Sequence, residues 1–512
     1  MDTTRRDSFL LAVLLLILVL DRVLLLAYFG SRFTGVDDTV YWQAAEDYSH
    51  GIFREPFFYG QDYGYMAEAV LAVPFLWLGI SHHVALPMVT NILALLPFIF
   101  LAWAFRRSGS IISAALCLLV PLALPIEHGV LTSMSRGFVS GLPFAALLFF
   151  CFFVPAERRA YLLFGCVAPF AFLVNPNTVP IIVLTGAYLC SRTVPDIRWY
   201  GLLLLPAIPL YWLHGSAEAF YETNPEYLVH WMADIEFSWT GLMDAVSQLD
   251  LYFKHLGPLF WGAGWIWLLL VGVLGAWAWP KDRRWSIVVI CTAVSLLLML
   301  GINKVRDGHE SIFHSRERMY LAFPVIVAFT IGWTARLFQW SGRGWNGALI
   351  MLGIALFGIK SGYQSVIING LTTNEDQGPV AIVPMERLVH DCSRLAALAD
   401  AADADVIVMV PDHGKTTSMQ GVRTYACPLI EPRMKDTFLI VGERRTWMYK
   451  RQAVAIPKNV IIYGQVQVPD SLPHGSRVLR LDHDLLLIQG NAQPLGTLLG
   501  TCGAAMKRHL YM

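Results

Sequence analysis

The chain has 512 residues, of which 56% are hydrophobic and only 15% are charged, and its mean hydropathy is +0.52. One water-soluble core cannot bury so much apolar surface, so the composition is that of an integral membrane protein. The formal net charge is zero and no run of Lys or Arg occurs, so nothing in the sequence indicates a nucleic-acid partner.

The first apolar stretch, near residues 9 to 29, follows Arg5 and Arg6 and lacks a small-residue cleavage site. It is therefore expected to stay in the protein as a signal anchor that starts on the cytoplasmic side. The same stretch contains Asp21 and Arg22, and ionisable residues inside a span are costly. We expect Asp21 to meet a neighbouring helix and Arg22 to extend outward to the interface.

A helix needs about 20 mostly apolar residues to cross the hydrocarbon layer. Segments of this kind recur along the chain and predict a mainly α-helical, polytopic transmembrane bundle of about eleven spans. They lie near residues 9–29, 84–105, 109–126, 137–154, 160–174, 178–190, 199–213, 258–279, 285–302, 319–340 and 346–367.

A further hydrophobic piece, Tyr65 to Ile80, would invert every later loop if it crossed the membrane. Without it, basic pairs such as 106–107, 158–159 and 283–284 all face the same side as the N-terminus, as the positive-inside rule requires. We therefore expect an amphipathic helix in the outer interface, with Glu68 toward water and Phe75, Leu76 and Trp77 toward lipid.

Charged residues become frequent after about residue 370. Short β-rich runs alternate there with MERLVHDCSRLAALADA, which is apolar at helical spacing, and this predicts a compact α/β domain outside the membrane. We divide the chain into a membrane domain, residues 1–370, and an extracytoplasmic domain, residues 371–512. The cysteines of the tail show no CxxC spacing, so neither a zinc site nor a disulfide framework is argued from them. The β-rich runs are 406–410, 437–441, 459–463 and 484–488.

The first outer loop, residues 30–83, is rich in carboxylates. Neighbouring like charges and partial desolvation raise carboxylate pKa values, and such a group can serve as a general base. An ordinary solvated loop is also acidic, so acid content alone supports both interpretations. The acids are Asp37, Asp38, Glu46, Asp47, Glu55, Asp62 and Glu68.

The order of residues in this loop is more specific than its acid content. GVDDTVYWQAAEDYSHG, then EPFFYGQDYGYMAEAVLAVPFLWLG, then a span that ends in Arg-Arg, resembles the first loop of GT-C glycosyltransferases, close to the protein mannosyltransferase and aminoarabinose transferase branch. Farther on, FHSRERMYLAFPVIVAF is similar to the start of a late span in that family. The resemblance covers roughly residues 1–340. The Lys-Pro-Pro-Leu element of the mannosyltransferase branch is absent, so the donor and acceptor of the better-known branches are not carried over.

The resemblance implies an enzyme of the bacterial inner membrane. It would take a sugar from a polyprenyl-phosphate donor and pass it to a hydroxyl of a glycan, lipid or protein on the outer side. By its place in the motif, Asp37 is the expected general base. Asp38 orients Asp37, binds a divalent cation or exchanges roles with it, since such a pair titrates jointly.

An inverting transfer also needs a cationic clamp for the departing phosphate. The outer loop NKVRDGHESIFHSRER places His314, Arg316 and Arg318 beside a span, and Arg136 starts an outer helix. The alternative is that the basic residues of that loop pair with its own acids or extend to the interface.

Asn175 and Asn177 lie in FLVNPNTVP, where two prolines interrupt an apolar segment. Irregular backbone at membrane depth is tolerated where it is buried in protein or lines a cavity. These residues therefore either form a tight outer turn or donate hydrogen bonds to a sugar. Tyr63 and Glu68 complete the substrate-binding residues expected in the first loop.

Two rival functions fit the same composition: a lipid-linked-sugar flippase or other transporter, and a non-catalytic membrane protein that binds glycolipid. Transporters usually show internal repeats and broken helices near the membrane midplane, whereas the polar residues here concentrate in outer loops. Substitution of Asp37 separates the three, because only an enzyme would lose transfer while it keeps glycolipid binding.

Overall fold

The structure is a computed structural model. It describes residues 3–61, 63–192, 197–225, 227, 235–259, 263–340, 343–373, 382–410, 418–434, 438–440, 456–464, 476–482 and 484–502. Contacts group the chain into two compact units. The membrane unit comprises Met1–Gly30, Pro87–Ala217 and Ala233–Asp376, and the loop–tail unit comprises Ser31–Leu86, Glu218–Met232 and Gln377–Met512.

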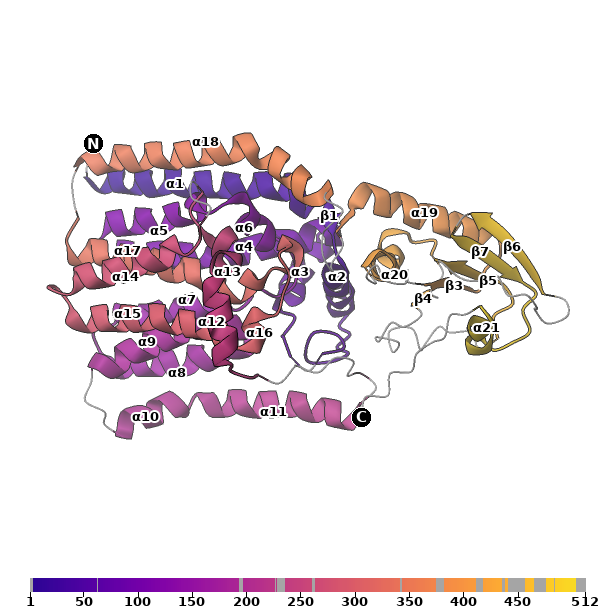
Figure 1. Ribbon diagram of the computed structural model, residues 1–512, viewed down its shortest axis with the longest axis horizontal. Coiled ribbons are helices and arrows are strands. Elements are labelled where there is room, and N and C mark those ends of the chain that lie inside the picture. Colours follow the sequence, from indigo (N-terminus) through magenta and orange to yellow (C-terminus); the bar gives the residue numbers. More distant parts are fainter. Residues whose placement is uncertain are drawn as a thin grey trace. The chain divides into compact units, whose positions relative to one another are not determined.

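Each of the predicted spans contains helix, which confirms the mainly helical bundle (Figure 1). Among the described residues, five stretches are long and apolar enough to cross a membrane, namely Arg6–Gly30, His82–Arg107, Arg283–Gly301, Arg316–Leu337 and Trp345–Thr373. The other predicted spans hold shorter helices or helices in two pieces, so the number of about eleven crossings remains a prediction. The helices that correspond to the predicted spans are α1 (Thr3–Leu25), α4 (His82–Arg107), α5 (Ile111–Ala123), α7 (Leu142–Leu147), α8 (Glu157–Val174), α9 (Val179–Arg192), α10 (Ile197–Leu204), α11 (Ala207–Thr223), α14 (Ile266–Ala278), α15 (Arg283–Leu298), α17 (Phe323–Leu337) and α18 (Arg343–Thr373).

An aromatic cluster lies in the core of the membrane unit. The rings of Phe149 and Phe329 stack with their centroids 4.1 Å apart, and those of Phe152 and Tyr188 with their centroids 3.9 Å apart. The ring of Trp285 meets Phe152 edge-on at 5.6 Å. Helices in lipid associate through close packing, since the lipid tails are as apolar as the side chains. These interlocking rings therefore join α9, α15 and α17 to the 3-10 turn 148–152 that follows α7.

The two ionisable residues of α1 are both buried. The Lys360 ammonium of α18 donates a hydrogen bond of 2.8 Å to the Asp21 carboxylate, which confirms that Asp21 meets a neighbouring helix. Arg22 is only 5% exposed and donates to the hydroxyl of Thr132 at 2.9 Å. The prediction that Arg22 extends to the interface is wrong, because its guanidinium finds polar partners inside the bundle, among them Asn91 at 3.4 Å.

The tail folds around a five-stranded mixed sheet with the order β4-β3-β5-β7-β6. The strand β3 (Val406–Met409) runs parallel to β4 (Phe438–Ile440) and to β5 (Val460–Tyr463). The strand β7 (Leu485–Gln489) runs antiparallel to β5 and to β6 (Arg477–Asp482). All four predicted strands are present, and β6 is a strand that the pattern missed. The α/β character of the tail is confirmed.

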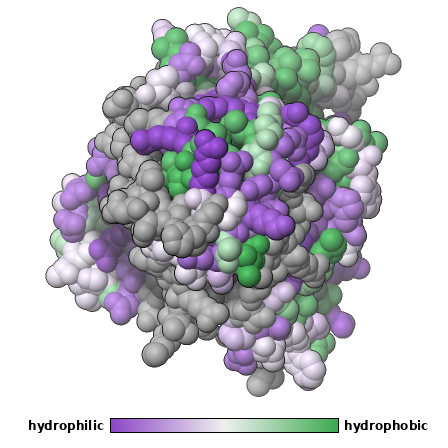
Figure 2. Space-filling model, turned by 90° about the vertical axis from the view of Figure 1, so that its right-hand side faces the viewer, coloured by the Kyte–Doolittle hydropathy of each residue, from purple (hydrophilic) through white to green (hydrophobic). Residues whose placement is uncertain are grey.

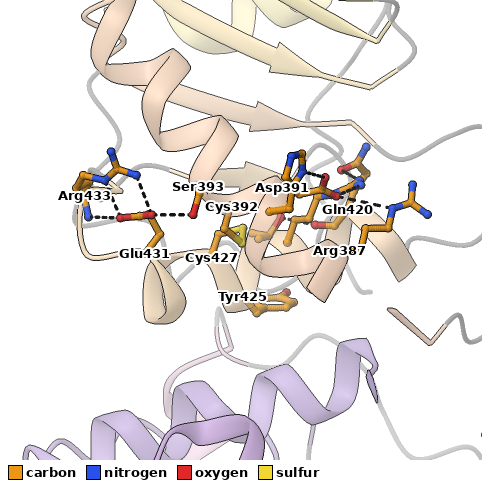
Figure 3. The surroundings of a disulfide bond; sticks show 12 residues. Arg387, Asp391, Cys392, Ser393, Gln420, Tyr425, Cys427, Glu431 and Arg433 are labelled. Carbon is orange, nitrogen blue, oxygen red and sulfur yellow. Dashed lines mark hydrogen bonds and ion pairs between the residues drawn. A yellow bond between two sulfur atoms is a disulfide. The ribbon is translucent and has the colours of Figure 1, made fainter. Parts of the chain in front are cut away.

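Two helices of the tail, α19 (Met385–Ala401) and α20 (Ser418–Ile430), are joined by a disulfide between Cys392 and Cys427 (Figure 3). The sequence offered no disulfide framework, because the two cysteines are 35 residues apart and meet only in the fold. Beside the disulfide, the Arg423 guanidinium donates to the Asp391 carboxylate at 2.6 Å. A short helix, α21 (Leu495–Thr501), closes the described tail.

The first outer loop packs on the tail within the loop–tail unit. The strand β1 (Phe33–Thr34) pairs antiparallel with β2 (Val383–Pro384), and the amide of Met385 donates to the carbonyl of Arg32 at 2.8 Å. The helix α2 (Val36–Ser49) lies against α20, where the Gln43 amide donates to the carbonyl of Tyr425 at 2.6 Å. A Cβ on Gly421 would lie 3.0 Å from the Val36 side chain, so this helix crossing is close.

The described surface of the tail differs from that of a lipid-facing bundle. On the face that Figure 2 presents, hydrophilic residues cover most of the described area, with small hydrophobic patches between them. In the membrane unit, by contrast, large apolar side chains such as Leu16, Tyr211 and Met351 are exposed, at 59%, 76% and 64%. Such a contrast is expected between a domain in water and helices in lipid.

Candidate functional site

The two acids of the expected catalytic motif lie in the first turn of α2. Gly35 precedes the helix in an extended conformation, and its backbone amide donates a hydrogen bond of 2.7 Å to the carboxylate of Asp38. Asp38 is therefore a capping residue, 6% exposed, that satisfies one amide at the helix start. Asp37 is half-buried and makes no hydrogen bond or ion pair with any residue that the structure describes. A carboxylate in the first turn is also favoured by the helix dipole.

Asp47, at the other end of α2, is fully engaged. The Arg54 guanidinium donates to both of its oxygens, at 2.5 and 2.8 Å, and the Tyr59 hydroxyl donates at 3.0 Å. Burial raises the pKa of the Tyr59 phenol, and the Asp47 charge adds to this effect. The bidentate pair holds the loop that leaves α2, and it gives Asp47 a structural role.

Glu55 and Glu46 also have polar partners within the protein. Glu55 is completely buried and accepts hydrogen bonds from the Gly60 amide at 3.0 Å and from the Tyr221 hydroxyl at 2.9 Å. Glu46 faces the imidazole of His82 at 3.0 Å. Asp62, the remaining acid between Glu55 and Glu68, lies outside the described residues.

Glu68 was expected to face water, and this prediction is wrong. The helix α3 (Ala67–Trp77) forms as expected, but Glu68 is completely buried in the loop–tail unit, because tertiary packing covers the face that carries it. Burial raises the pKa of the Tyr41 phenol well above its ordinary value, and the nearby Glu68 charge is the next cause. Trp77 is 70% exposed, as expected for a side chain at the lipid interface. Tyr63 is half-buried in the bend before α3.

In the membrane unit, the Arg318 side chain forms hydrogen bonds within its own loop. Its guanidinium donates to the Asp307 carboxylate at 3.2 Å and to the carbonyl oxygen of Ser315 at 3.1 Å. The next acid, Glu317, is 1% exposed and accepts from the backbone amide and the imidazole of His255, at 2.8 and 2.7 Å. The pairing alternative that we left open for this loop thus holds for Arg318.

Arg316 is less constrained than Arg318. Its Nε donates to the carbonyl of Gly308 at 3.2 Å, and its guanidinium lies over the ring of Tyr252 at 5.5 Å. Within the described part of the chain it makes no ion pair with a carboxylate. Gly308 has a φ of 146°, and a Cβ there would lie 2.8 Å from the Arg316 amide, so this turn requires glycine. The turn and the aromatic ring hold one side of a guanidinium whose other nitrogens remain available to an anion.

Arg136 approaches the same segment from another part of the chain. It is 8% exposed, and its Nη1 donates to the carbonyl of Phe313, next to His314. The backbone amide of His309 donates to the carbonyl of His314 at 2.8 Å, which closes the turn. The structure therefore brings Arg136 to the segment that carries His314, Arg316 and Arg318. No sequence signal links Arg136 to this loop, since the contact spans 177 residues.

Asn175 and Asn177 form a tight turn. The Asn175 side chain accepts from the amide of Asn177 at 2.9 Å and donates to the carbonyl of Gly137 at 2.8 Å. The Asn177 side chain donates to the carbonyl of Phe138 at 2.6 Å. Each side-chain NH₂ group thus donates to a backbone carbonyl of the protein, which supports the turn interpretation, and a contact of these residues with sugar remains a prediction. In the described ranges, no three His, Cys, Asp or Glu side chains gather to hold a metal ion, so the role of Asp38 as a cation ligand also remains a prediction.

Comparison with known proteins shows similarity both in sequence and in structure. No protein-family model matches the chain. A galactan 5-O-arabinofuranosyltransferase of Mycolicibacterium smegmatis is 25% identical over 175 residues, which are 31% of this chain and 28% of that protein. The chain therefore matches little more than a quarter of its relative's length.

The crystal structure of ArnT from Cupriavidus metallidurans aligns over 93% of this chain and 97% of that chain, with a TM-score of 0.56 and 12% identity. The oligosaccharyltransferase of Archaeoglobus fulgidus aligns at a TM-score of 0.40, with 10% identity over 87% of this chain and 68% of that chain, which is too low to establish a shared fold. The expectation is confirmed for the fold: the chain has the same overall fold as ArnT.

Proposed function

We propose that this protein is a GT-C glycosyltransferase that moves a sugar from a polyprenyl-phosphate carrier to an acceptor hydroxyl on the outer side of a bacterial inner membrane. The ArnT-like fold supports the class. The observation that carries the proposal is that the Asp37 carboxylate has no hydrogen-bond or ion-pair partner among the described residues. It sits in an acid-rich loop, where the five other described carboxylates have partners.

Asp37 acts as the general base in the proposed reaction. Its carboxylate takes the proton of the acceptor hydroxyl as that oxygen attacks the anomeric carbon of the donor. The bond from the anomeric carbon to the phosphate oxygen breaks, and polyprenyl phosphate leaves with the bonding electrons. Asp38, which accepts from Gly35, fixes the turn of α2 and so positions Asp37.

The departing phosphate carries developing negative charge, and Arg316 is the cation best suited to stabilise it. Its guanidinium makes one backbone hydrogen bond and no carboxylate pair among the described residues, whereas Arg318 already binds Asp307. Arg136 holds the backbone of the same segment. Both Arg136 and Arg318 are therefore positioning residues in this proposal.

The proposed orientation places the N-terminus in the cytoplasm and the tail outside. The Cys392–Cys427 disulfide supports it, because disulfides persist in oxidising compartments. Nucleotide sugars are made in the cytoplasm, so a transfer on the outer side favours a lipid-linked donor. The division into a catalytic membrane domain, residues 1–370, and a tail domain, residues 371–512, remains a prediction, and the tail shapes acceptor access in this account.

A donor test separates an enzyme from a flippase or a glycolipid-binding protein. The full chain in lipid nanodiscs is given polyprenyl-phosphate arabinofuranose with a galactan acceptor, since the related protein is named for that transfer. Other polyprenyl-phosphate sugars and nucleotide sugars are given in parallel. We expect release of polyprenyl phosphate and a glycosylated acceptor from at least one lipid-linked donor and from no nucleotide sugar. Turnover of a nucleotide sugar, or movement of donor between leaflets without its cleavage, would contradict the proposal.

A further inference from the structure

A cavity of about 780 Å³ lies within the membrane unit. Its lining includes the start of α1, the start of α18 and the end of α17, and Figure 1 shows where these helices lie in the bundle. The start of α5 forms another wall. None of the residues discussed as part of the candidate site lines it. The charged and amide side chains of the lining are Arg6, Asp7, Arg336, Gln339 and Asn346.

The Arg336 side chain packs against two aromatic rings, but one of its nitrogens has no hydrogen-bond acceptor among the described residues. Its guanidinium lies over the ring of Trp333 at 4.9 Å and over that of Phe153 at 5.1 Å. Its Nη1 is buried and has no hydrogen-bond partner, and the residue forms no ion pair within the described ranges. A buried guanidinium nitrogen without an acceptor is costly. Nη1 itself is covered by protein, but Arg336 as a whole is half-buried and lines the cavity, so its cationic side chain, which pairs with no carboxylate among the described residues, can meet an anion there.

The remaining charges of the lining leave an excess of positive charge. Arg6 is exposed and lines the same cavity. Asp7 is the one acid among the lining residues, and its carboxylate accepts a hydrogen bond from the Asn346 amide at 3.3 Å. The charged residues of the described lining are thus two arginines and one aspartate, and a phosphate group is the complementary ligand because Arg binds it through paired hydrogen bonds.

Most of the remaining lining is apolar, apart from Ser110 and Ser113 at the start of α5. Phe9, Leu10, Ile111, Ile112 and Ile350 contribute to it, and Phe9 is 57% exposed at the outer surface of α1. A soluble anion gains nothing from such walls, whereas an amphiphile fits both parts of the lining. Trp340, which also lines the cavity, stacks on Trp345 at 6.4 Å, and tryptophans of this kind sit at the level of lipid headgroups.

The same end of the bundle carries basic residues. Arg106 and Arg107 end α4, and the Arg106 guanidinium donates to the Ser8 hydroxyl of α1 at 3.0 Å, next to the cavity. The positive-inside rule assigns such an end to the cytoplasmic side, whose leaflet is rich in anionic lipid. We propose that this cavity binds the phosphate and upper acyl chains of an anionic phospholipid of the cytoplasmic leaflet, with Arg6 and Arg336 as the phosphate ligands.

The full chain, purified in neutral detergent, tests this by native mass spectrometry. It is titrated with short-chain phosphatidylglycerol, with phosphatidylcholine of the same chains, with polyprenyl phosphate, and with glycerol phosphate as a soluble competitor. The variants are Arg6→Gln and Arg336→Gln. The matched control is Arg107→Gln, which removes an arginine that lies over the Trp103 ring at the same end but does not line the cavity.

We expect the parent protein to retain phosphatidylglycerol in preference to phosphatidylcholine, and glycerol phosphate not to displace it. Each of the two test variants should weaken this binding about tenfold, as for the loss of one charge-assisted hydrogen bond, and Arg107→Gln should leave it unchanged. If Arg336→Gln unfolds the protein, Arg6→Gln decides, because Arg6 is exposed. Equal binding of the two lipids, an equal loss in the control, or displacement by glycerol phosphate would overturn the inference. Preference for polyprenyl phosphate would overturn it too, and would in addition move the sugar donor away from the proposed site.

Discussion

The Gly35 amide donates a hydrogen bond of 2.7 Å to the carboxylate of Asp38, while the adjacent Asp37 has no such bond among the described residues. This difference predicts different outcomes for the two acids. Asp38→Ala removes a helix cap and should cost about 1 kcal/mol of stability, together with transfer activity. Asp37→Ala should remove transfer and lower the thermal midpoint less than Asp38→Ala does, because it loses only the helix-dipole interaction and no hydrogen bond among the described residues. Thermal unfolding in nanodiscs measures the stability of both variants, and a transfer assay measures their activity. An equal loss of stability in the two variants would contradict the assigned roles.

The buried pair of Lys360 and Asp21 predicts a strong asymmetry between single and double substitutions. Lys360→Met leaves a carboxylate buried without its partner, which is expected to cost on the order of 3 kcal/mol. Replacing both, as in the double variant Asp21→Leu with Lys360→Met, should recover most of that loss because no charge stays buried. The thermal midpoints of the three variants measure this coupling. Additive losses in the double variant would show that the pair does not hold α1 to α18.

The disulfide predicts that the tail loses stability under reduction. Cys392 and Cys427 close a loop across 35 residues of sequence, so their replacement by Ala should destabilise the tail by roughly 3 kcal/mol. Thiol labelling of the denatured protein, with and without reductant, reports whether the bond is present. Cys502, a buried free cysteine of the same tail, is the matched control, since its replacement by Ala should not change the reductant effect. Free Cys392 and Cys427 thiols in protein isolated without reductant would contradict the disulfide.

The proposed orientation predicts which side of the membrane each loop occupies. Phe53 is 69% exposed in the first loop, and Arg107 is exposed at the end of α4. A cysteine introduced at position 53 should react with a membrane-impermeant maleimide on intact spheroplasts, and one at position 107 only after lysis. The exposed native Cys166, Cys190 and Cys291 are first replaced by Ser. Reaction in the opposite order would place the acidic loop in the cytoplasm.

Elements whose signal lies in their own residues were predictable from the sequence. Apolar runs identified the segments that form the helices of the predicted spans, namely α1, α4, α5, α7 to α11, α14, α15, α17 and α18, and β-rich runs identified β3, β4, β5 and β7. The strand β6, whose residues are mostly exposed, carries no apolar run and was missed. The residue order of the first loop was enough to suggest the fold that the ArnT comparison confirms.

Features that depend on distant partners were not predictable. Arg22 stays inside the bundle because Thr132 accepts its hydrogen bond, 110 residues away. Glu68 is buried because tertiary packing covers α3, and hydropathy of the helix alone does not reveal this. The Arg316 guanidinium lies over the ring of Tyr252, and no pattern in the sequence predicts this contact. In each case the deciding contact joins parts of the chain that only the fold brings together.

The central claim is that Asp37 is the base of a sugar transfer, and the variant Asp37→Asn tests it most directly. This change keeps the size of the side chain and removes its capacity to take a proton. With the donor identified as above, the rate of acceptor glycosylation should fall by on the order of a hundredfold or more, while binding of the polyprenyl-phosphate sugar stays the same. The matched change Asp47→Asn, at an acid already bound to Arg54 and Tyr59, should leave a protein that still transfers if it folds. Full transfer activity in Asp37→Asn, with donor binding intact, would contradict the account.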